Sequence, residues 1–375
     1  MTKSNPDPPR RLVVAMSGGV DSSVAAWKLA QEGWEVIGLF MRNGVSVAEG
    51  ESRKKSCCSI SDARDARMVA AHLGVPFHAI DLGGEFRDII QYFLDEYARG
   101  RTPNPCAVCN RDLKFDALLR FAEELGAEGI ATGHYARIDI VAGRPQVRRG
   151  VDADKDQSYQ LFCVEEANLL RTHLPLGALE KPAVRALAEE AGLRTAKKAD
   201  SQEICFVPSN DYRQLLEAEG RELHPGNFVD SGGRVLGQHL GTEHFTIGQR
   251  RGHGIGGGTP LYVLELNPAT GTVVLGPREE ASFRSLEARQ LNWIGFDPPP
   301  SGEFRCHIQH RYHCTPALAT VSVDGKEATA VFDEPEMAVT PGQGAAFYEG
   351  DRLLGGGWIA SAERVPAESA QNPRP

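Results

Sequence analysis

The sequence predicts an α/β domain with a doubly wound parallel sheet at the N-terminus, a helical extension, and then a β-rich central domain and a C-terminal β-barrel. Over roughly the first 135 residues, short apolar runs alternate with amphipathic stretches of helical period, as in strand–helix–strand units. From His224 onward, short β-rich runs alternate with Gly and Pro, which is typical of small barrels and sandwiches. The length of 375 residues also exceeds that of one ordinary domain.

The strands and helices of the N-terminal domain are expected at apolar runs and at amphipathic stretches respectively. Four runs predict strands: Arg11–Met16, Glu35–Met41, Pro76–Leu82 and Gly129–Thr132. Four stretches predict helices: Ser22–Gly33, Ser61–Leu73, Gly84–Arg99 and Asn110–Leu125. Because this alternation gives a parallel sheet covered on both faces, ligands are expected at the carboxyl ends of its strands.

The rest of the chain predicts a change of architecture. The region from about 150 to 220 is expected to be mostly helical, and its clearest helix is Lys181–Ala191, with Pro182 in the first turn and Gly192 just past the end. Six later runs predict strands: Tyr262–Leu266, Thr272–Leu275, Phe304–Ile308, Ala317–Val323, Ala328–Phe332 and Ala345–Tyr348. The predicted segments are a polar lead-in at 1–9, the α/β domain with its helical part at 10–220, the central domain at 221–286, the barrel at 287–365 and a tail at 366–375.

Composition and charge narrow the functional class. No apolar run reaches the ~20 residues that span a bilayer, and the polar start lacks a signal core, so we expect no membrane association and a cytoplasmic location. The net charge of −9 does not suggest nucleic acid, although an acidic protein can hold a local basic groove. Without an export signal, the eight cysteines do not predict a disulfide scaffold. Cys163 is expected to fill the core, and the adjacent Cys57 and Cys58 to be structural.

The most informative segment is the string Ser-Gly-Gly-Val-Asp-Ser-Ser at Ser17–Ser23, which follows a predicted strand and opens a predicted helix. Gly18 and Gly19 permit a sharp turn and a close approach to a ligand, and the N–H groups of the new helix then face an anion. The segment lacks the Gly-Lys-Ser/Thr ending of a Walker A loop and the glycine spacing of the dinucleotide fingerprint. It therefore indicates a phosphate loop of another kind. An ordinary turn before a capped helix would explain the two glycines but not the whole string.

Two cysteine segments indicate sulfur chemistry. Cys109 opens a predicted helix, whose dipole lowers a thiol pKa, and Cys205 follows the basic pair Lys197-Lys198. Sulfur transfer needs one thiol to carry the sulfur atom and a second to resolve or activate the adduct. Half a zinc site is an alternative for Cys106 and Cys109, but zinc needs four ligands and the sequence has no second Cys-x-x-Cys. Cys106, Cys109 and Cys205 together could instead hold an iron–sulfur cluster with one open iron.

The Ser17–Ser23 string resembles the pyrophosphatase loop of the ATP-using adenylating superfamily, which includes GMP synthetase, NAD synthetase, asparagine synthetase, argininosuccinate synthetase and the tRNA thiolation enzymes. Members of this superfamily cleave ATP between the α- and β-phosphates and attach AMP to an oxygen. With the two cysteine segments, the resemblance sharpens to the bacterial tRNA 2-thiouridylase family and extends over almost the whole chain. Further matching motifs lie at Gly38–Met41, Ala131–Tyr135, Lys155–Tyr159, Thr246–Gly252, Arg311–Tyr312 and Thr340–Gln343.

The resemblance implies a role for each matching position. ATP with Mg²⁺ is expected to contact Ala15, Met16, Ser17, Gly18, Gly19, Val20, Asp21, Ser22, Met41 and Gly133. The target base is expected beside Asn104, Pro105 and Cys106. The residues expected to contact tRNA are His134, Lys155, Asp156, Gln157, Arg311, Tyr312 and Gln343. Cys109 is implied as the nucleophile, and Cys205 as the persulfide carrier that forms a reversible disulfide with it. Some relatives have Asp where this chain has Cys106, which leaves Cys106 as a spectator, a second resolving thiol or a cluster ligand.

The activity implied by the resemblance is ATP-dependent 2-thiolation of a tRNA uridine, at the wobble position, through adenylation of the base O2 and sulfur transfer from a cysteine persulfide. The implied partners are tRNA and a persulfide donor protein, either a cysteine desulfurase or a relay, and the chain is expected to be a monomer. A 4Fe–4S cluster is the alternative to the persulfide. Two other functions stay open, a small-molecule adenylating synthetase or amidotransferase and a non-catalytic tRNA-binding protein. The absence of a glutaminase-like segment speaks against the first, and the intact phosphate loop against the second.

Overall fold

The computed structural model describes residues 10–44, 60–200, 204–207, 211–221, 223–256, 258–298 and 302–365. The Cys57-Cys58 pair, the lead-in at 1–9 and the tail at 366–375 lie outside these residues. The chain divides into two compact units. The first comprises Met1–Asp88 and Val108–Asn210, and the second Ile89–Ala107 and Asp211–Pro375.

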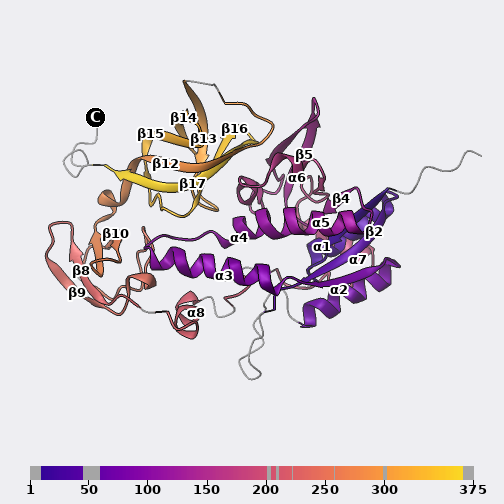
Figure 1. Ribbon diagram of the computed structural model, residues 1–375, viewed down its shortest axis with the longest axis horizontal. Coiled ribbons are helices and arrows are strands. Elements are labelled where there is room, and N and C mark those ends of the chain that lie inside the picture. The colour runs from indigo at the N-terminus through magenta and orange to yellow at the C-terminus, as the bar shows by residue number, and fades with distance from the viewer. Residues whose placement is uncertain are drawn as a thin grey trace, which may run out of the picture. The chain divides into compact units, whose positions relative to one another are not determined.

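The first unit is built on a sheet of five parallel strands (Figure 1). In spatial order these are β3 (Phe77–Asp81), β2 (Glu35–Arg42), β1 (Arg11–Ala15), β4 (Gly129–Ala131) and β7 (Thr172–His173). Both faces of the central strand are covered. Leu12 and Val14 pack into the cluster formed with the neighbouring helices, while Val13, also fully buried, lies outside that cluster. A strand that is buried on both faces has a continuous apolar sequence, which is why β1 could be predicted.

Helices surround this sheet. α1 (Val20–Gln31) packs against both α2 (Ile60–Leu73) and α7 (Lys181–Glu190), and α5 (Leu118–Glu124) packs against β1 and β4. The remaining elements of residues 83–210 are α3 (Gly83–Ala98), α4 (Pro105–Val108), the π-helical segment η1 (Cys109–Ala117), the hairpin β5 (Ala136–Val141) and β6 (Arg144–Arg149), the short helix η2 (Ser158–Leu161) and α6 (Glu166–Leu169).

The strand order creates a switch point beside β1. The chain runs outward from β1 through β2 to β3, and then returns to place β4 on the other side of β1. Connections that leave the two neighbouring strands in opposite directions open a crevice at their carboxyl ends, where ligands bind in folds of this type. The Ser17–Ser22 segment follows β1 at this position.

The second unit contains α8 (Tyr212–Ala218) and a small sheet in the order β10 (Tyr262–Asn267), β11 (Thr272–Gly276), β8 (Gly226–Asp230) and β9 (Val235–His239). Short helical turns at η3 (Thr242–His244) and η4 (Arg278–Ala281) flank it. The sheet encloses its own apolar cluster, to which the side chains of Phe228, Phe245, Val263, Val273 and Leu275 contribute.

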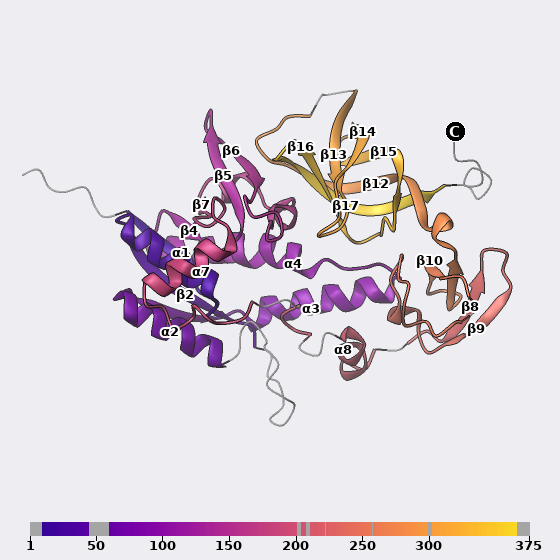
Figure 2. The same cartoon turned by 180° about the vertical axis from the view of Figure 1, so that it is seen from behind.

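Six antiparallel strands of the second unit form a barrel, drawn in orange and yellow in Figure 2. Their order is β12 (Ser282–Trp293), β15 (Glu327–Met337), β14 (Ala317–Asp324), β13 (Glu303–Gln309), β16 (Gly344–Glu349) and β17 (Arg352–Arg364). β12 also pairs with β17 and so closes the ring. Closure leaves these strands with few unpaired edges, as a barrel requires.

The predicted fold class is confirmed, with two corrections. The region from 150 to 220 is not mostly helical: among its described residues only α7 and the shorter η2, α6 and α8 are helical, and the strand β7 lies between α6 and α7. The predicted boundary between 286 and 287 falls inside β12, which belongs to the barrel. β12 was not predicted because exposed residues, among them Arg284, Glu287 and Arg289, are interspersed with buried ones along the strand. It therefore presents no apolar run.

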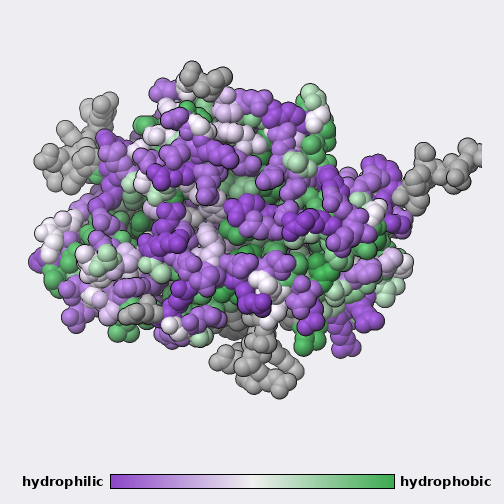
Figure 3. All heavy atoms as spheres, viewed as in Figure 1, coloured by the Kyte–Doolittle hydropathy of each residue, from purple (hydrophilic) through white to green (hydrophobic). Residues whose placement is uncertain are grey.

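No helix among the described residues is long and apolar enough to cross a membrane. The face of the molecule in Figure 3 is mainly hydrophilic, with apolar residues interspersed among the polar ones.

Barrel closure should depend on Gly355 in β17. Its φ of +136° is rarely adopted by other residues, and a Cβ would lie 2.1 Å from the carbonyl oxygen of Asn292 in β12. We therefore expect Gly355→Ala to lower the free energy of unfolding by ~2 kcal/mol or more. The midpoint of urea unfolding measures this, with Gly256→Ala as control because no atom lies within 4 Å of the Cβ it would add. Equal midpoints for the two variants would contradict the expectation.

Candidate active site

The phosphate loop is a preformed turn between β1 and α1. Gly18 has a φ of +73°, and a Cβ there would lie 2.2 Å from the carbonyl oxygen of Asp62. The Ser17 N–H donates to the Ser22 hydroxyl oxygen at 3.1 Å, and the Ser23 hydroxyl donates to the Gly19 carbonyl at 2.7 Å. These bonds fix the shape of the turn. The first N–H groups of a helix have no partner within it, so the start of α1 can bind an anion.

The segments predicted to bind ATP converge at one edge of the sheet. Met41 lies near the end of β2 and Gly133 just beyond β4, and these strands flank β1. A Cβ on Gly133 would lie 2.9 Å from the backbone nitrogen of Ser22, so only glycine permits this approach. Ala15 and Met16 are buried in the core and could offer a ligand only their backbone.

Asp21, in the first turn of α1, is the charged centre of the loop. The Tyr135 hydroxyl donates to its Oδ1 at 2.7 Å, and the Lys181 ammonium lies 2.8 Å from both carboxylate oxygens. Burial, together with the neighbouring Asp21, raises the pKa of Tyr135 far above its usual value, so the phenol keeps its proton. Neither Tyr135 nor Lys181 was predicted as a site residue. Lys181 showed only as the start of a helix, and no pattern linked it to a residue 160 positions away.

A second carboxylate extends this network. Asp200 lies 2.9 Å from the Lys181 ammonium, 2.7 Å from the Arg185 guanidinium and 2.8 Å from the Lys155 ammonium. Burial disfavours its charge, but the hydrogen bonds from Lys155 and Lys181 outweigh burial and lower the pKa of Asp200 to about 2. Asp200 is therefore ionised at neutral pH and holds three cations, Lys181 and Arg185 from α7 and Lys155 from the turn before η2.

A third interaction fixes the loop from outside. The Lys198 ammonium donates to the Gly18 carbonyl at 2.8 Å and to the carboxylates of Asp62 and Asp65 at 2.6 and 2.7 Å. Burial opposes the charged form of Lys198, but these two carboxylates raise its pKa overall. Lys198 thus braces the backbone of the turn.

The predicted tRNA contacts of the first unit differ in how accessible they are. His134 is buried, with Nδ1 2.6 Å from the Thr132 hydroxyl oxygen; burial, and then Lys114, lower its pKa well below the usual value, so its ring is neutral. Asp156 accepts hydrogen bonds from the Arg149 side chain, the Gly150 N–H, and the N–H and hydroxyl of Ser158.

Two neighbours of Asp156 complete this group. The Gln157 Oε1 accepts from the Tyr135 N–H at 3.0 Å, so the amide side chain fixes the strand end that carries Tyr135. Lys155 is half-buried, and its ammonium lies on Asp200 as described above. Of this group, Lys155 is the cation that a phosphate could reach.

In the second unit, two motifs that are far apart in sequence meet. The Gln343 Nε2 donates to the carbonyl oxygens of Thr102 and Pro103, at 3.2 and 2.8 Å, and the Thr102 N–H donates to the Pro341 carbonyl at 2.9 Å. The next residue, Asn104, is buried and its Oδ1 accepts from the Ala107 N–H at 3.2 Å. Gln343 therefore holds the segment that leads into α4, where Pro105 and Cys106 lie.

The remaining predicted tRNA residues lie after β13. The Arg311 guanidinium donates to the Ile247 carbonyl at 3.2 Å and to the Thr340 hydroxyl at 3.3 Å. The Tyr312 ring is half-buried and lies with its centroid 3.9 Å from that of His313. This arrangement offers an aromatic face beside a cation, which suits stacking on a nucleic-acid base.

One expectation about the cysteines is corrected. Cys109 does not open a helix, because Val108 before it already has helical angles of −61° and −45° and α4 begins at Pro105. The helix dipole therefore gives no reason to expect a lowered pKa for Cys109. Cys109 and Cys205 are half-buried and Cys106 is exposed. Cys163 is buried, as expected of core filler, and burial raises its pKa to about 12.

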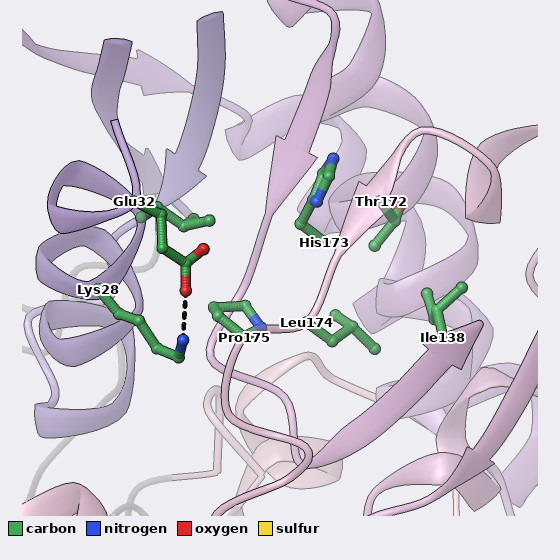
Figure 4. Close-up of a pocket in the computed structure, with 8 residues that line it drawn as sticks. Lys28, Glu32, Ile138, Thr172, His173, Leu174 and Pro175 are labelled. Atoms are coloured by element: carbon green, nitrogen blue, oxygen red, sulfur yellow. Dashed lines mark hydrogen bonds and ion pairs between the residues drawn. The ribbon is translucent and has the colours of Figure 1, made fainter. Parts of the chain in front are cut away.

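No metal cluster marks a second centre in the part of the chain that the structure describes. Within the described ranges, no three His, Cys, Asp or Glu side chains are grouped to hold a metal ion, so the iron–sulfur cluster stays a hypothesis. Figure 4 shows a hollow lined by Lys28, Glu32, His173 and Pro175, among others. Lys28 and Glu32 lie at the far end of α1 from the phosphate loop, where the helix dipole disfavours anions.

Three family models match successive parts of the chain. They are described as a tRNA methyl transferase HUP domain, at residues 10–209, a tRNA methyl transferase PRC-barrel domain, at 213–277, and an aminomethyltransferase β-barrel domain, at 283–359. The three matches follow the order α/β domain, small β-rich sheet and barrel that the structure shows.

Curated relatives match along nearly the full length and carry one common name, tRNA-specific 2-thiouridylase MnmA. The protein of Geobacter metallireducens is 49 % identical over 360 residues, which cover 94 % of this chain and 97 % of that protein. The protein of Carboxydothermus hydrogenoformans is 49 % identical, over 93 % of this chain and 97 % of its own. The protein of Clostridium perfringens is 43 % identical, over 94 % of this chain and 99 % of its own. The chain therefore belongs to the family of the tRNA-specific 2-thiouridylases.

Proposed function

We propose that this protein is a tRNA-uridine 2-sulfurtransferase that uses ATP to activate the base. The observation that carries the proposal is the phosphate loop at the switch point of the sheet, in a chain that matches this family over 94 % of its length. The family descriptions mention a methyl transferase. The site favours an ATP-using enzyme instead, because a turn followed by free helix N–H groups suits the phosphates of ATP.

The first step is adenylation of the base. The N–H groups at the start of α1 bind the phosphates, and the Asp21 carboxylate would hold a Mg²⁺ ion whose charge would offset theirs. The uridine O2 forms a bond to the α-phosphorus and N3 loses its proton, while the bond from that phosphorus to the bridging oxygen breaks and pyrophosphate leaves. Met41 and Gly133 border the nucleotide from the neighbouring strands.

tRNA presents the target base to the adenylation site. The target uridine, at the wobble position, must leave its stack to reach the α-phosphate. Asn104, Pro105 and Cys106 lie beside the base, and Gln343 acts by holding that segment. The remaining tRNA contacts come from residues at the carboxyl edge of the sheet and after β13, namely His134, Lys155, Asp156, Gln157, Arg311 and Tyr312.

The second step transfers sulfur. A cysteine desulfurase or relay protein loads Cys205 as a persulfide, and its terminal sulfur bonds to C2 of the adenylated base as AMP leaves. Cys109 attacks the Cys205 sulfur, the persulfide S–S bond breaks, and a Cys109–Cys205 disulfide forms. A cellular thiol then reduces that disulfide for the next turnover. This redox cycle needs a reducing compartment, which supports a cytoplasmic location, and no step calls for a second copy of the chain.

ATP labelled at the α-phosphate tests the assignment. Purified protein with unmodified tRNA should release labelled AMP and unlabelled pyrophosphate in step with sulfur incorporation, and should release little of either without tRNA. An amidotransferase-like synthetase would release pyrophosphate with a small acceptor instead, and a non-catalytic binding protein would release none. Either of those results would overturn the proposal.

Gly133→Ala should impair adenylation. The added Cβ would meet the Asp21 and Ser22 backbone at 2.9 Å and displace the loop, and such a misplacement costs on the order of a hundredfold in rate. The tRNA-dependent rate of pyrophosphate release measures the effect. Gly84→Ala is the matched control, because its added Cβ would meet no atom closer than 3.9 Å. A normal rate for Gly133→Ala would place the ATP site elsewhere.

Lys155→Met should weaken tRNA binding more at low salt than at high salt. Removing one phosphate contact should lower the slope of log affinity against log salt by about one. Binding of labelled tRNA across a salt series measures the slope, and Lys326→Met, which changes an exposed lysine in the turn between β14 and β15, serves as control. If both variants keep the slope of the parent protein, Lys155 does not contact tRNA.

The cysteine variants distinguish the persulfide from a cluster. Cys205→Ser should adenylate tRNA but never thiolate it, and Cys109→Ser should accept sulfur on Cys205 and stall. Cys106→Ser should be mild, because no persulfide step needs a third thiol. Sulfur transfer and iron content are measured on the same anaerobic samples. An inactive, iron-free Cys106→Ser beside an active, iron-loaded parent would favour the cluster, since serine oxygen holds such a cluster poorly.

A further inference from the structure

The phosphate loop carries no cation of its own. Ser17–Ser22 consists of two glycines, two serines, one valine and one acidic residue, Asp21. It lacks the lysine of a Walker A loop. ATP brings several negative charges to this point, and pyrophosphate gains more as it leaves. Helix N–H groups alone offset only about half a unit charge. A positive side chain must therefore reach the loop from another part of the first unit.

Among the described residues, two lysines contact the loop, and they differ in what they can do. Lys198 is held by three acceptors, the Gly18 carbonyl and the carboxylates of Asp62 and Asp65, and all of these belong to the protein scaffold. Moving Lys198 would release the turn that it braces. Lys181 touches the loop only through Asp21, a side chain that retains about a third of its exposure.

Lys181 is held in place through its backbone N–H and through a second carboxylate, that of Asp200. Its N–H donates to the Asp152 carboxylate at 2.8 Å, and α7, which it begins, packs against α1. The side chain is only 10 % exposed, which is rare for lysine unless it is paired. Its ammonium lies 2.9 Å from Asp200, which Arg185 and Lys155 also hold. Lys181 can thus leave Asp21 without leaving Asp200 uncompensated.

We propose that Lys181 is a catalytic residue of the adenylation step, which binds the pyrophosphate portion of ATP; this rests on the proposed function. Asp21 would hold the Mg²⁺ that accompanies ATP, and the Lys181 ammonium would then turn from Asp21 to the β- and γ-phosphates. As the base O2 bonds to the α-phosphorus, the electron pair of the breaking bond moves onto the bridging oxygen of pyrophosphate. The ammonium stabilises that charge most where it develops. Asp200 is the positioning residue that keeps the lysine charged and aimed.

The test compares ligands with and without the outer phosphates. Pyrophosphate and AMP are each titrated, in the presence of Mg²⁺, against a fluorescent ATP analogue bound to full-length protein. Lys181→Met should weaken pyrophosphate binding about 10- to 100-fold, the loss expected for a hydrogen bond to a charged group, and leave AMP binding unchanged. Lys181→Arg, which keeps the charge, should recover most of the pyrophosphate affinity. Lys28→Met, at the other end of α1, is the control.

Each other outcome overturns the inference. Unchanged pyrophosphate affinity would show that Lys181 does not reach the outer phosphates. An equal loss for pyrophosphate and AMP would show that the lysine only supports the loop. If Lys181→Met fails to fold, the same titrations with Lys181→Gln, whose amide can still bond to Asp200, give the same distinction. Failure of the proposed function is separate, since it would appear as parent protein that binds pyrophosphate but does not thiolate tRNA.

Discussion

The close approach of backbone to backbone around the phosphate loop is the constraint on which the first unit depends. Gly18 lies against Asp62 of α2, and Gly133 lies against the start of α1, each at a separation that no Cβ allows. These contacts set where α1 begins and therefore where its N–H groups point. A parallel sheet whose order reverses beside β1 then puts neighbouring strand ends around the same point.

Charge and anchoring contacts build outward from that geometry. Asp21 and Asp200 bring Lys155 together with Lys181 and Arg185 of α7, so a residue expected to contact tRNA and residues at the phosphate loop share one network. In the second unit, Gln343 fastens the segment before α4. Two motifs separated by 241 positions thus form one local structure.

The features that could be predicted from the sequence are those that a local residue pattern determines. Four strands of the parallel sheet were predictable from their apolar runs, and the loop because its string follows a strand. The fifth, β7, was not predicted, because its two residues, Thr172 and His173, form no apolar run. Lys181 and Tyr135 were missed because their contacts with Asp21 arise only when distant segments fold together. The start of the cysteine helix was misplaced although a signal existed: Asn104 before Pro105 is a helix cap followed by proline in the first turn.

The central claim is that this chain replaces the O2 of a tRNA uridine with sulfur at the expense of ATP. Mass spectrometry of nucleosides from tRNA incubated with the purified protein, a persulfide donor and ATP with Mg²⁺ tests it most directly. We expect 2-thiouridine to form only when ATP and tRNA are both present. It should be absent when the ATP supplied cannot be cleaved between its α- and β-phosphates. A methylated uridine, or 2-thiouridine formed equally well without ATP, would contradict it.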